Sequence, residues 1–153
     1  MSLQTDIIFV KAIKSDTDLI SHLAAGDVYN TTIALPDEDL DNAKLPYCIV
    51  SQGEVVNDNY TKDDYEGETD NVTITIEVAA KTRPELGMLA DMIRKAIRRY
   101  FSNSQEGDED HDMVPVDYQF SAKPVTYDQL KPCYWQELTY QCEVINDTLQ
   151  DGN

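Results

Sequence analysis

The densest run of possible metal ligands in the sequence is Asp108-Glu109-Asp110-His111-Asp112. Acidic residues at alternating positions match the start of a calcium-binding EF-hand loop, which takes oxygen ligands at positions 1, 3 and 5. Such a loop also needs glycine at position 6 and glutamate at position 12, where this chain has Met113 and Gln119. We therefore expect no EF-hand site here and interpret the run as a solvated acidic loop.

Histidine and cysteine are the other residue types that could bind a metal or act as catalysts. His22 and His111 have no cysteine or second histidine at the spacing of a zinc site. Cys48, Cys133 and Cys142 form no CxxC pair, and their odd number argues against a disulfide framework. Cysteines that form no disulfide framework are typical of a protein in a reducing compartment. A cysteine–histidine pair that meets only in the folded chain stays open as an alternative.

The common motifs of enzyme active sites are absent from the sequence. There is no GxSxG, no GxGxxG and no phosphate-binding loop, and the chain has only six glycines. We therefore expect no catalytic residue, no metal and no cofactor, and a protein that is not an enzyme.

The net charge of the 153-residue chain is −17, from 29 acidic and 12 basic residues. So acidic a chain repels phosphate, which disfavours non-specific binding to nucleic acid. Residues 37–41, 58–70 and 106–112 hold four, six and five of the acids, in segments that we expect to be loops. The second and third segments contain the candidate acids of a functional surface: Asp58, Asp63, Asp64, Glu66, Glu68, Asp70, Glu106, Asp108, Glu109, Asp110 and Asp112.

Four cations cluster late in the helix that we expect over residues 83–101: Arg94, Lys95, Arg98 and Arg99. One interpretation is that they balance the negative end of the helix dipole. The other is that they form a basic patch that docks an acidic loop of a neighbouring copy. Head-to-tail contacts of that kind close into rings when the rotation between copies permits.

Residues 71–101 contain the strongest structural signal, a strand followed by a helix. The apolar side chains of residues 72–80 alternate, as in a strand with one buried face. Thr82 and Glu85 then form a capping box, with Pro84 in the first turn, and apolar residues recur at helical spacing up to Phe101.

The remaining segments complete an α+β domain over residues 1–145, followed by a polar tail over 146–153. We expect a short helix over 5–14, with a strand as the alternative, and a second helix that begins at Ser15. Strands would then begin near residues 45, 114 and 134. The last two strands would pair as a hairpin joined by residues 123–132. The predicted architecture is a mainly antiparallel sheet of four or more strands, with the long helix and the two short ones on one face. No apolar run reaches the length of about 20 residues that spans a bilayer, so we expect no membrane segment.

The order of these segments resembles that of the tail-completion proteins, also called tail-terminator or head–tail joining proteins, of long-tailed bacteriophages and prophages. Residues 9–23 (FVKAIKSDTDLISHL) are similar to the family's opening helix, acidic break and second small helix. Gly26-Asp27-Val28-Tyr29 and Leu45-Pro46-Tyr47 resemble its turn and its next strand, and residues 134–140 its closing hairpin. The acidic segments 57–70 and 103–112 depart from the family pattern.

The resemblance implies a structural virion protein that forms a ring, typically a hexamer, on the last disc of the tail tube. The ring would stop tube growth and present a joining surface to the head connector, with DNA passing through its lumen without specific binding. The protein would then lie at the head–tail junction of the virion, and in the bacterial cytoplasm during assembly. The alternative is an acidic protein that mimics nucleic acid and inhibits a basic partner.

Overall fold

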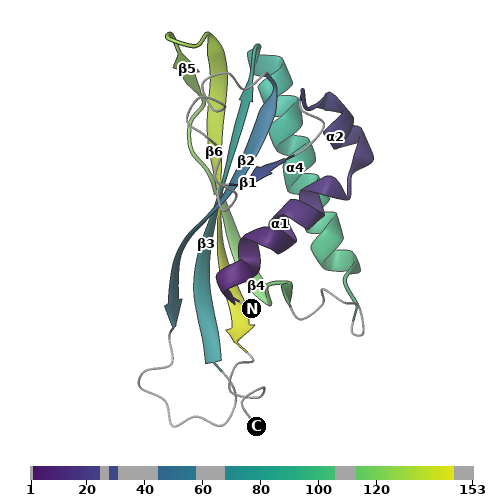
Figure 1. Ribbon diagram of the computed structural model, residues 1–153, viewed down its shortest axis with the longest axis vertical. Helices are drawn as coiled ribbons and strands as arrows, with labels where there is room; N and C mark the ends of the chain where they lie inside the picture. Colours follow the sequence, from purple (N-terminus) through teal and green to yellow (C-terminus); the bar gives the residue numbers. More distant parts are fainter. Residues whose placement is uncertain (1, 25–27, 31–44, 58–67, 106–112, 147–153) are drawn as a thin grey trace.

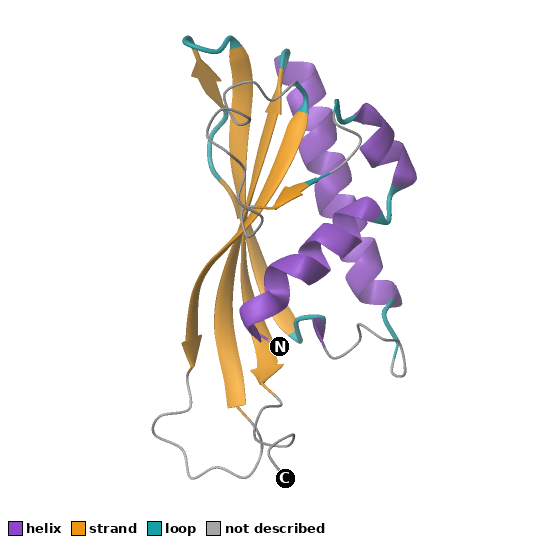
Figure 2. Ribbon diagram, in the orientation of Figure 1, coloured by secondary structure: helices purple, strands orange, loops and turns teal. Residues whose placement is uncertain are grey.

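The structure is a computed structural model that describes residues 2–24, 28–30, 45–57, 68–105 and 113–146. They form two layers, a six-stranded twisted sheet and a layer of helices on one of its faces (Figure 1, Figure 2). The helical elements are η1 (Ser2–Gln4), α1 (Thr5–Lys14), α2 (Thr17–His22) and α4 (Arg83–Asn103). The strands are β1 (Tyr29–Asn30), β2 (Tyr47–Asn57), β3 (Glu68–Ala80), β4 (Asp117–Ala122), β5 (Thr126–Asp128) and β6 (Cys133–Asn146). The predicted α+β class is confirmed.

The strands lie in the order β1-β2-β3-β6-β4, and β5 pairs with the first residues of β6. Among the described strands only β1 runs parallel to its neighbour, so the sheet is mainly antiparallel, as the sequence predicts. The centre of the sheet is fixed by β3, whose Ile76 lies opposite Val50 of β2 on one side and Leu138 of β6 on the other. The expected pairing of the last two long strands is also confirmed, since β4 is antiparallel to β6.

The hydrophobic core lies between the sheet and the helices. The even-numbered residues of β3 from 72 to 80 are buried, which confirms the predicted alternation. Phe9 of α1 joins the layers, since its ring lies 5.1 Å from the rings of both Phe101 on α4 and Tyr140 on β6. Complete burial of such side chains is worth about 1.5–3 kcal/mol each, so these positions hold the two layers together.

The start of α4 follows the prediction and the start of α2 does not. Thr82 caps α4, because its Oγ1 accepts a hydrogen bond of 3.3 Å from the backbone N–H of Glu85. The cap of α2 is Asp16 and not the expected Ser15, because the Asp16 carboxylate accepts from two N–H groups of the first turn, at 3.1 and 3.2 Å. Ser15 instead ends α1, and its hydroxyl donates to the carbonyl of Ala12.

Three expectations about the strands are wrong. Glu68 and Asp70 belong to β3 and not to a loop. Val114 and Val116 precede β4, because Pro115 between them has no N–H to donate to a sheet ladder, and Val116 is 57% exposed. The segment 123–132 is more than a linker, since it contains β5. The predicted tail from residue 146 begins inside β6 with Asn146, and residues 147–153 lie outside the described part.

Candidate functional site

The face of the sheet that points away from the helices is the open face (Figure 1). It carries the odd-numbered residues of β3, β4 and β6, whereas the register shift in β2 after Gln52 places Val56 on it, opposite Asn71. Near the start of β2 and β6 this face bears a small apolar cluster of Tyr47, Ile49, Ala79 and Cys133, against which Trp135 packs. Farther along the strands the open face becomes polar and carries carboxylates, as on β6, where Glu137 and Glu143 follow Trp135.

Two pairs of carboxylates lie directly opposite each other on the open face. The first pair is Glu77 of β3 and Glu137 of β6. The second pair is Asp117 of β4 and Glu143 of β6. Like charges directly opposite each other on one face of a sheet are destabilising unless something compensates them.

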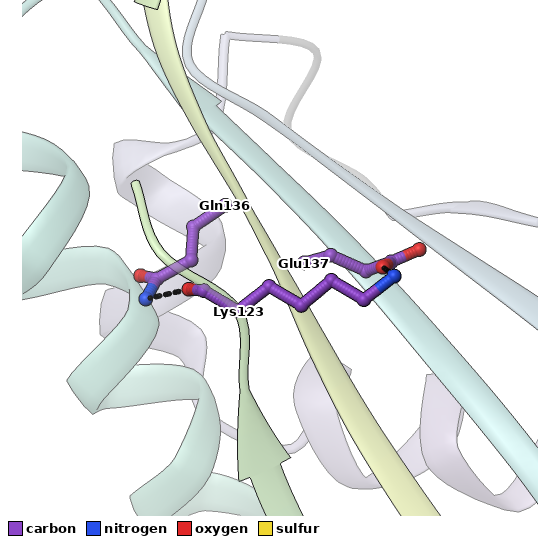
Figure 3. A network of polar contacts seen from close by, with 3 residues as sticks. All are labelled: Lys123, Gln136 and Glu137. Atoms are coloured by element: carbon purple, nitrogen blue, oxygen red, sulfur yellow. Dashed lines mark hydrogen bonds and ion pairs between the residues drawn. The ribbon is translucent and has the colours of Figure 1, made fainter. Parts of the chain in front are cut away.

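The negative charges of the first pair are compensated by other groups of the same chain. The Tyr47 hydroxyl donates a 3.0 Å hydrogen bond to Glu77 Oε2, and the Lys123 ammonium forms an ion pair with Glu137. Gln136 holds Lys123 in place, because its side-chain amide donates to the Lys123 carbonyl at 2.9 Å (Figure 3). Burial, and then the charge of Glu77, raise the pKa of the Tyr47 hydroxyl, so the group remains a donor.

The second pair borders a groove of about 410 Å³ and has no such compensation. Asp117 Oδ1 accepts a 2.8 Å hydrogen bond from the backbone N–H of Tyr118, which satisfies part of one carboxylate. Within the described ranges, neither Asp117 nor Glu143 forms an ion pair. The rest of the groove is lined by Glu54, Val56, Asn71, Val72, Thr73, Tyr118, Gln119 and Gln141. It therefore has three carboxylates and no cation, and we call it the acidic groove.

The basic patch is carried by α4, which belongs to the layer of helices on the other face of the sheet (Figure 1). The Arg94 guanidinium stacks on the Phe120 ring, and Lys95 pairs with Asp91 at 3.1 Å. Arg98 and Arg99 are exposed and, among the residues that the structure describes, form no ion pair.

The helix-dipole interpretation of the basic patch is wrong. The helix continues to Asn103, so its last turn contains no basic residue. The helix dipole acts only within the last turn. It therefore does not explain the position of the four cations.

Most of the acids that the sequence proposes lie outside the described residues: Asp58, Asp63, Asp64, Glu66, Glu106, Asp108, Glu109, Asp110 and Asp112. Asp70 is described and is not a surface acid. Its side chain is 5% exposed and points to the helical side, where Asn57 Nδ2 donates to it at 2.8 Å. Asp70 points to the helical side because it occupies an even-numbered position of β3, and the even-numbered side chains of β3 are buried on that side.

The histidine and the cysteines do not form a catalytic group in the described residues. All three cysteines are buried and free. Burial raises the pKa of Cys48 and of Cys142 to about 12, so both stay protonated thiols at neutral pH. His22 is exposed on α2, whereas His111 lies outside the described part. Among the described residues no group of three histidine, cysteine or acidic side chains is placed to hold a metal ion, and no helix there has the length and apolarity to cross a membrane.

Comparison with models of known protein families finds no match to this chain, and comparison with curated proteins finds none either. The functional surfaces must therefore be judged from the residues themselves. Sequence reasoning missed the acidic groove, whose residues Glu54, Asp117 and Glu143 stand far apart in the chain. The one available signal was Glu143 on the polar face of an alternating strand, and only the strand register brings Asp117 beside it.

Proposed function

We propose that this protein is a structural, non-enzymatic component of a phage or prophage tail that caps the tail tube and joins it to the head connector. The observation that carries the proposal is the placement of charge on two opposite sides of one small domain. The open face presents a groove with three carboxylates, and the helical layer presents Arg98 and Arg99 without ion partners among the described residues. Surfaces that complement each other on opposite sides suit a subunit that assembles head to tail.

The order of the segments along the chain, which resembles that of tail-completion proteins, supports the same function. This resemblance is the basis for proposing a hexameric ring and, as partners, the tail-tube protein and the head connector. DNA would pass through the lumen of the ring without being bound. A net charge of −17 suits that role, because acidic side chains near the lumen repel phosphate. At physiological salt this repulsion acts over a Debye length of about 8 Å. The protein would then occupy the head–tail junction of the virion.

Electron microscopy of purified tail tubes from the phage or prophage that encodes the chain tests this proposal. Tubes would be mixed with the protein carrying a gold label on an added terminal tag, and imaged after removal of free protein. We expect label at one end of each tube and none along its length. Label spread along the tubes, or on no tube, contradicts the proposal. An unrelated acidic protein with the same tag is the control.

A second candidate, an acidic protein that mimics nucleic acid, is favoured by one observation. Glu54, Asp117 and Glu143 gather on one continuous surface, whereas the sequence alone placed about half of the acids in loops. A mimic would bind a basic nuclease or repressor of its host as a monomer and would ignore tail tubes. Affinity capture with the tagged chain from a host lysate, followed by a competition test with duplex DNA, separates the two functions.

A further inference from the structure

We propose that the acidic groove on the open face binds the basic patch on α4 of a second copy of this chain. This inference deepens the proposed function, on which it rests for its biological setting, by assigning the two surfaces through which neighbouring copies meet. The charges and positions of described residues on the two surfaces support this contact.

The two carboxylate pairs of the sheet differ in whether a cation of the chain neutralises them. Glu77 and Glu137 lie opposite each other, and the chain provides both a hydroxyl donor and the Lys123 ammonium for them. Asp117 and Glu143 lie opposite each other in the same way, but no cation of the described part of the chain reaches them. A guanidinium placed between the two carboxylates would relieve their repulsion and bind both.

The basic patch on α4 of a second copy can supply that cation. The basic patch offers four positive charges, but Arg94 is engaged with Phe120 and Lys95 with Asp91. Arg98 and Arg99 remain exposed, on a helix of 21 residues that fixes the positions of their backbone atoms. The planar guanidinium presents five N–H donors in a fixed fork, which suits paired carboxylates.

The positions of the two surfaces in the fold favour a contact between copies. The groove lies on the open face of the sheet, and α4, which carries the patch, lies in the layer of helices on the other face (Figure 1). Among the described residues, no cation of the same copy pairs with the groove carboxylates, whereas the exposed arginines of a second copy can reach them. This contact joins two different surfaces, so each added copy leaves one groove and one patch free. Repetition gives an open chain or a closed ring.

The net charge of the chain does not prevent this contact at physiological salt. At 0.15 M ionic strength, charges more than about 8 Å apart are largely screened from each other, whereas an ion pair in direct contact is screened much less. At 1 M salt the screening length is about 3 Å, and exposed ion pairs weaken as well. We therefore expect self-association at 0.15 M salt that declines as the salt concentration approaches 1 M.

Charge reversal on each surface, in the full-length chain, tests the proposal. The groove variant is D117K/E143K and the patch variant is R98E/R99E. The matched controls reverse charges on exposed residues outside both surfaces, Asp18→Lys on α2 and Arg83→Glu at the start of α4. Circular dichroism and thermal unfolding first establish that each variant is folded, and light scattering after size exclusion then gives its mass over a range of concentrations.

We expect the wild type and both controls to self-associate and each surface variant to be a monomer. The mixture of the two surface variants is the sharper measurement. The intact patch of the groove variant fits the intact groove of the patch variant, and the reversed groove fits the reversed patch, so the mixture should self-associate although each variant alone stays a monomer. A chain with all four reversals should self-associate again. If R98E/R99E unfolds, R98Q/R99Q takes its place with the same expectation.

Three results would overturn the proposal: a wild type that is a monomer at every concentration, surface variants that associate as the wild type does, and a mixture of variants that stays monomeric. None of them decides the proposed function, because a monomer that still labels one end of a tail tube retains the capping role with a different contact. Conversely, self-association of the mixture together with no label on tubes would retain the contact and reject the capping role.

Discussion

The guanidinium carbon of Arg94 lies 4.1 Å from the centre of the Phe120 ring, which ties helix α4 to the edge strand β4. Phe120 in turn lies 5.1 Å from the ring of Tyr140 in the core. One of the four cations of the basic patch is therefore part of the structural framework. Arg94 therefore differs in role from Arg98 and Arg99 of the same patch.

Replacement of Arg94 by alanine should lower the free energy of unfolding by about 0.5–1 kcal/mol, which is the usual size of an exposed cation–π contact. Arg98→Ala is the matched control, because Arg98 is exposed on the same helix and has no ring contact or ion pair among the described residues. Urea denaturation measures both. Equal losses in the two variants would show that the contact with Phe120 contributes nothing.

Replacement of Tyr140 by phenylalanine should leave the free energy of unfolding unchanged or raise it, by up to about 1 kcal/mol. Tyr140 is 1% exposed, and within the described residues its hydroxyl has no hydrogen-bond partner. Removing a buried polar group that lacks a partner removes a desolvation penalty. The control is Tyr127→Phe, because Tyr127 is 49% exposed and its hydroxyl can reach water. A loss of 1 kcal/mol or more on Tyr140→Phe alone would reveal a partner for the hydroxyl.

Raising the pH from 8 to 10 should lower the free energy of unfolding. The native pKa of Cys48 and of Cys142 is raised to about 12 by burial, whereas a thiol in the unfolded chain ionises near 8.5. Above pH 8.5 the unfolded state therefore loses protons that the native state keeps, so the stabilisation present below that pH is lost as the pH rises.

Each of these thiols can contribute up to about 1.4 kcal/mol per pH unit over that range. Urea denaturation at pH 7, 8, 9 and 10 measures the slope. The variant C48A/C142A is less stable at every pH because it loses buried volume, but its slope should be clearly shallower. An unchanged slope in this variant would show that the two thiols do not titrate on unfolding.

Replacement of Thr82 by alanine should lower the free energy of unfolding by about 1 kcal/mol, the typical value of a lost helix N-cap. The loss follows because the backbone N–H of Glu85 would no longer have the Thr82 hydroxyl as its acceptor. Thr82→Ser keeps an acceptor at the same position and should lie within a few tenths of a kcal/mol of the wild type. Thermal unfolding followed by circular dichroism distinguishes them, and a serine variant as unstable as the alanine variant would argue against a capping role.

The sequence predicts the elements whose signal is local. The strand β3, the helix α4 with its Thr82 cap, and the pairing of the last two long strands follow from hydrophobic periodicity and capping residues. Errors arise where one residue overrides a pattern. Pro115 interrupts the alternation of the valines beside it, and Asp16 is a better cap than its neighbour Ser15 because its carboxylate reaches two N–H groups.

The candidate site was harder to predict, because it depends on which residues become neighbours across strands. Asp117 and Glu143 are 26 positions apart, and only the register of β4 on β6 makes them a pair. The prediction that Asp70 is a surface acid was wrong for a related reason. Its place in an acidic stretch suggests exposure, but its position in β3 directs the side chain to the helical side of the sheet, where it accepts a hydrogen bond from Asn57. The basic patch was found from sequence, but its division into engaged and free arginines required the contact of Arg94 with Phe120.

The most direct test of the proposed capping function is the growth of tail tubes in the presence of this protein. Tube protein from the same genome would be polymerised with increasing amounts of the chain, at a few copies per growing end, and tube lengths measured by electron microscopy. The account predicts that tubes become shorter as the ratio of the chain to tube protein rises, while the unrelated acidic control leaves them unchanged. Tubes that keep their full length at every ratio would contradict it.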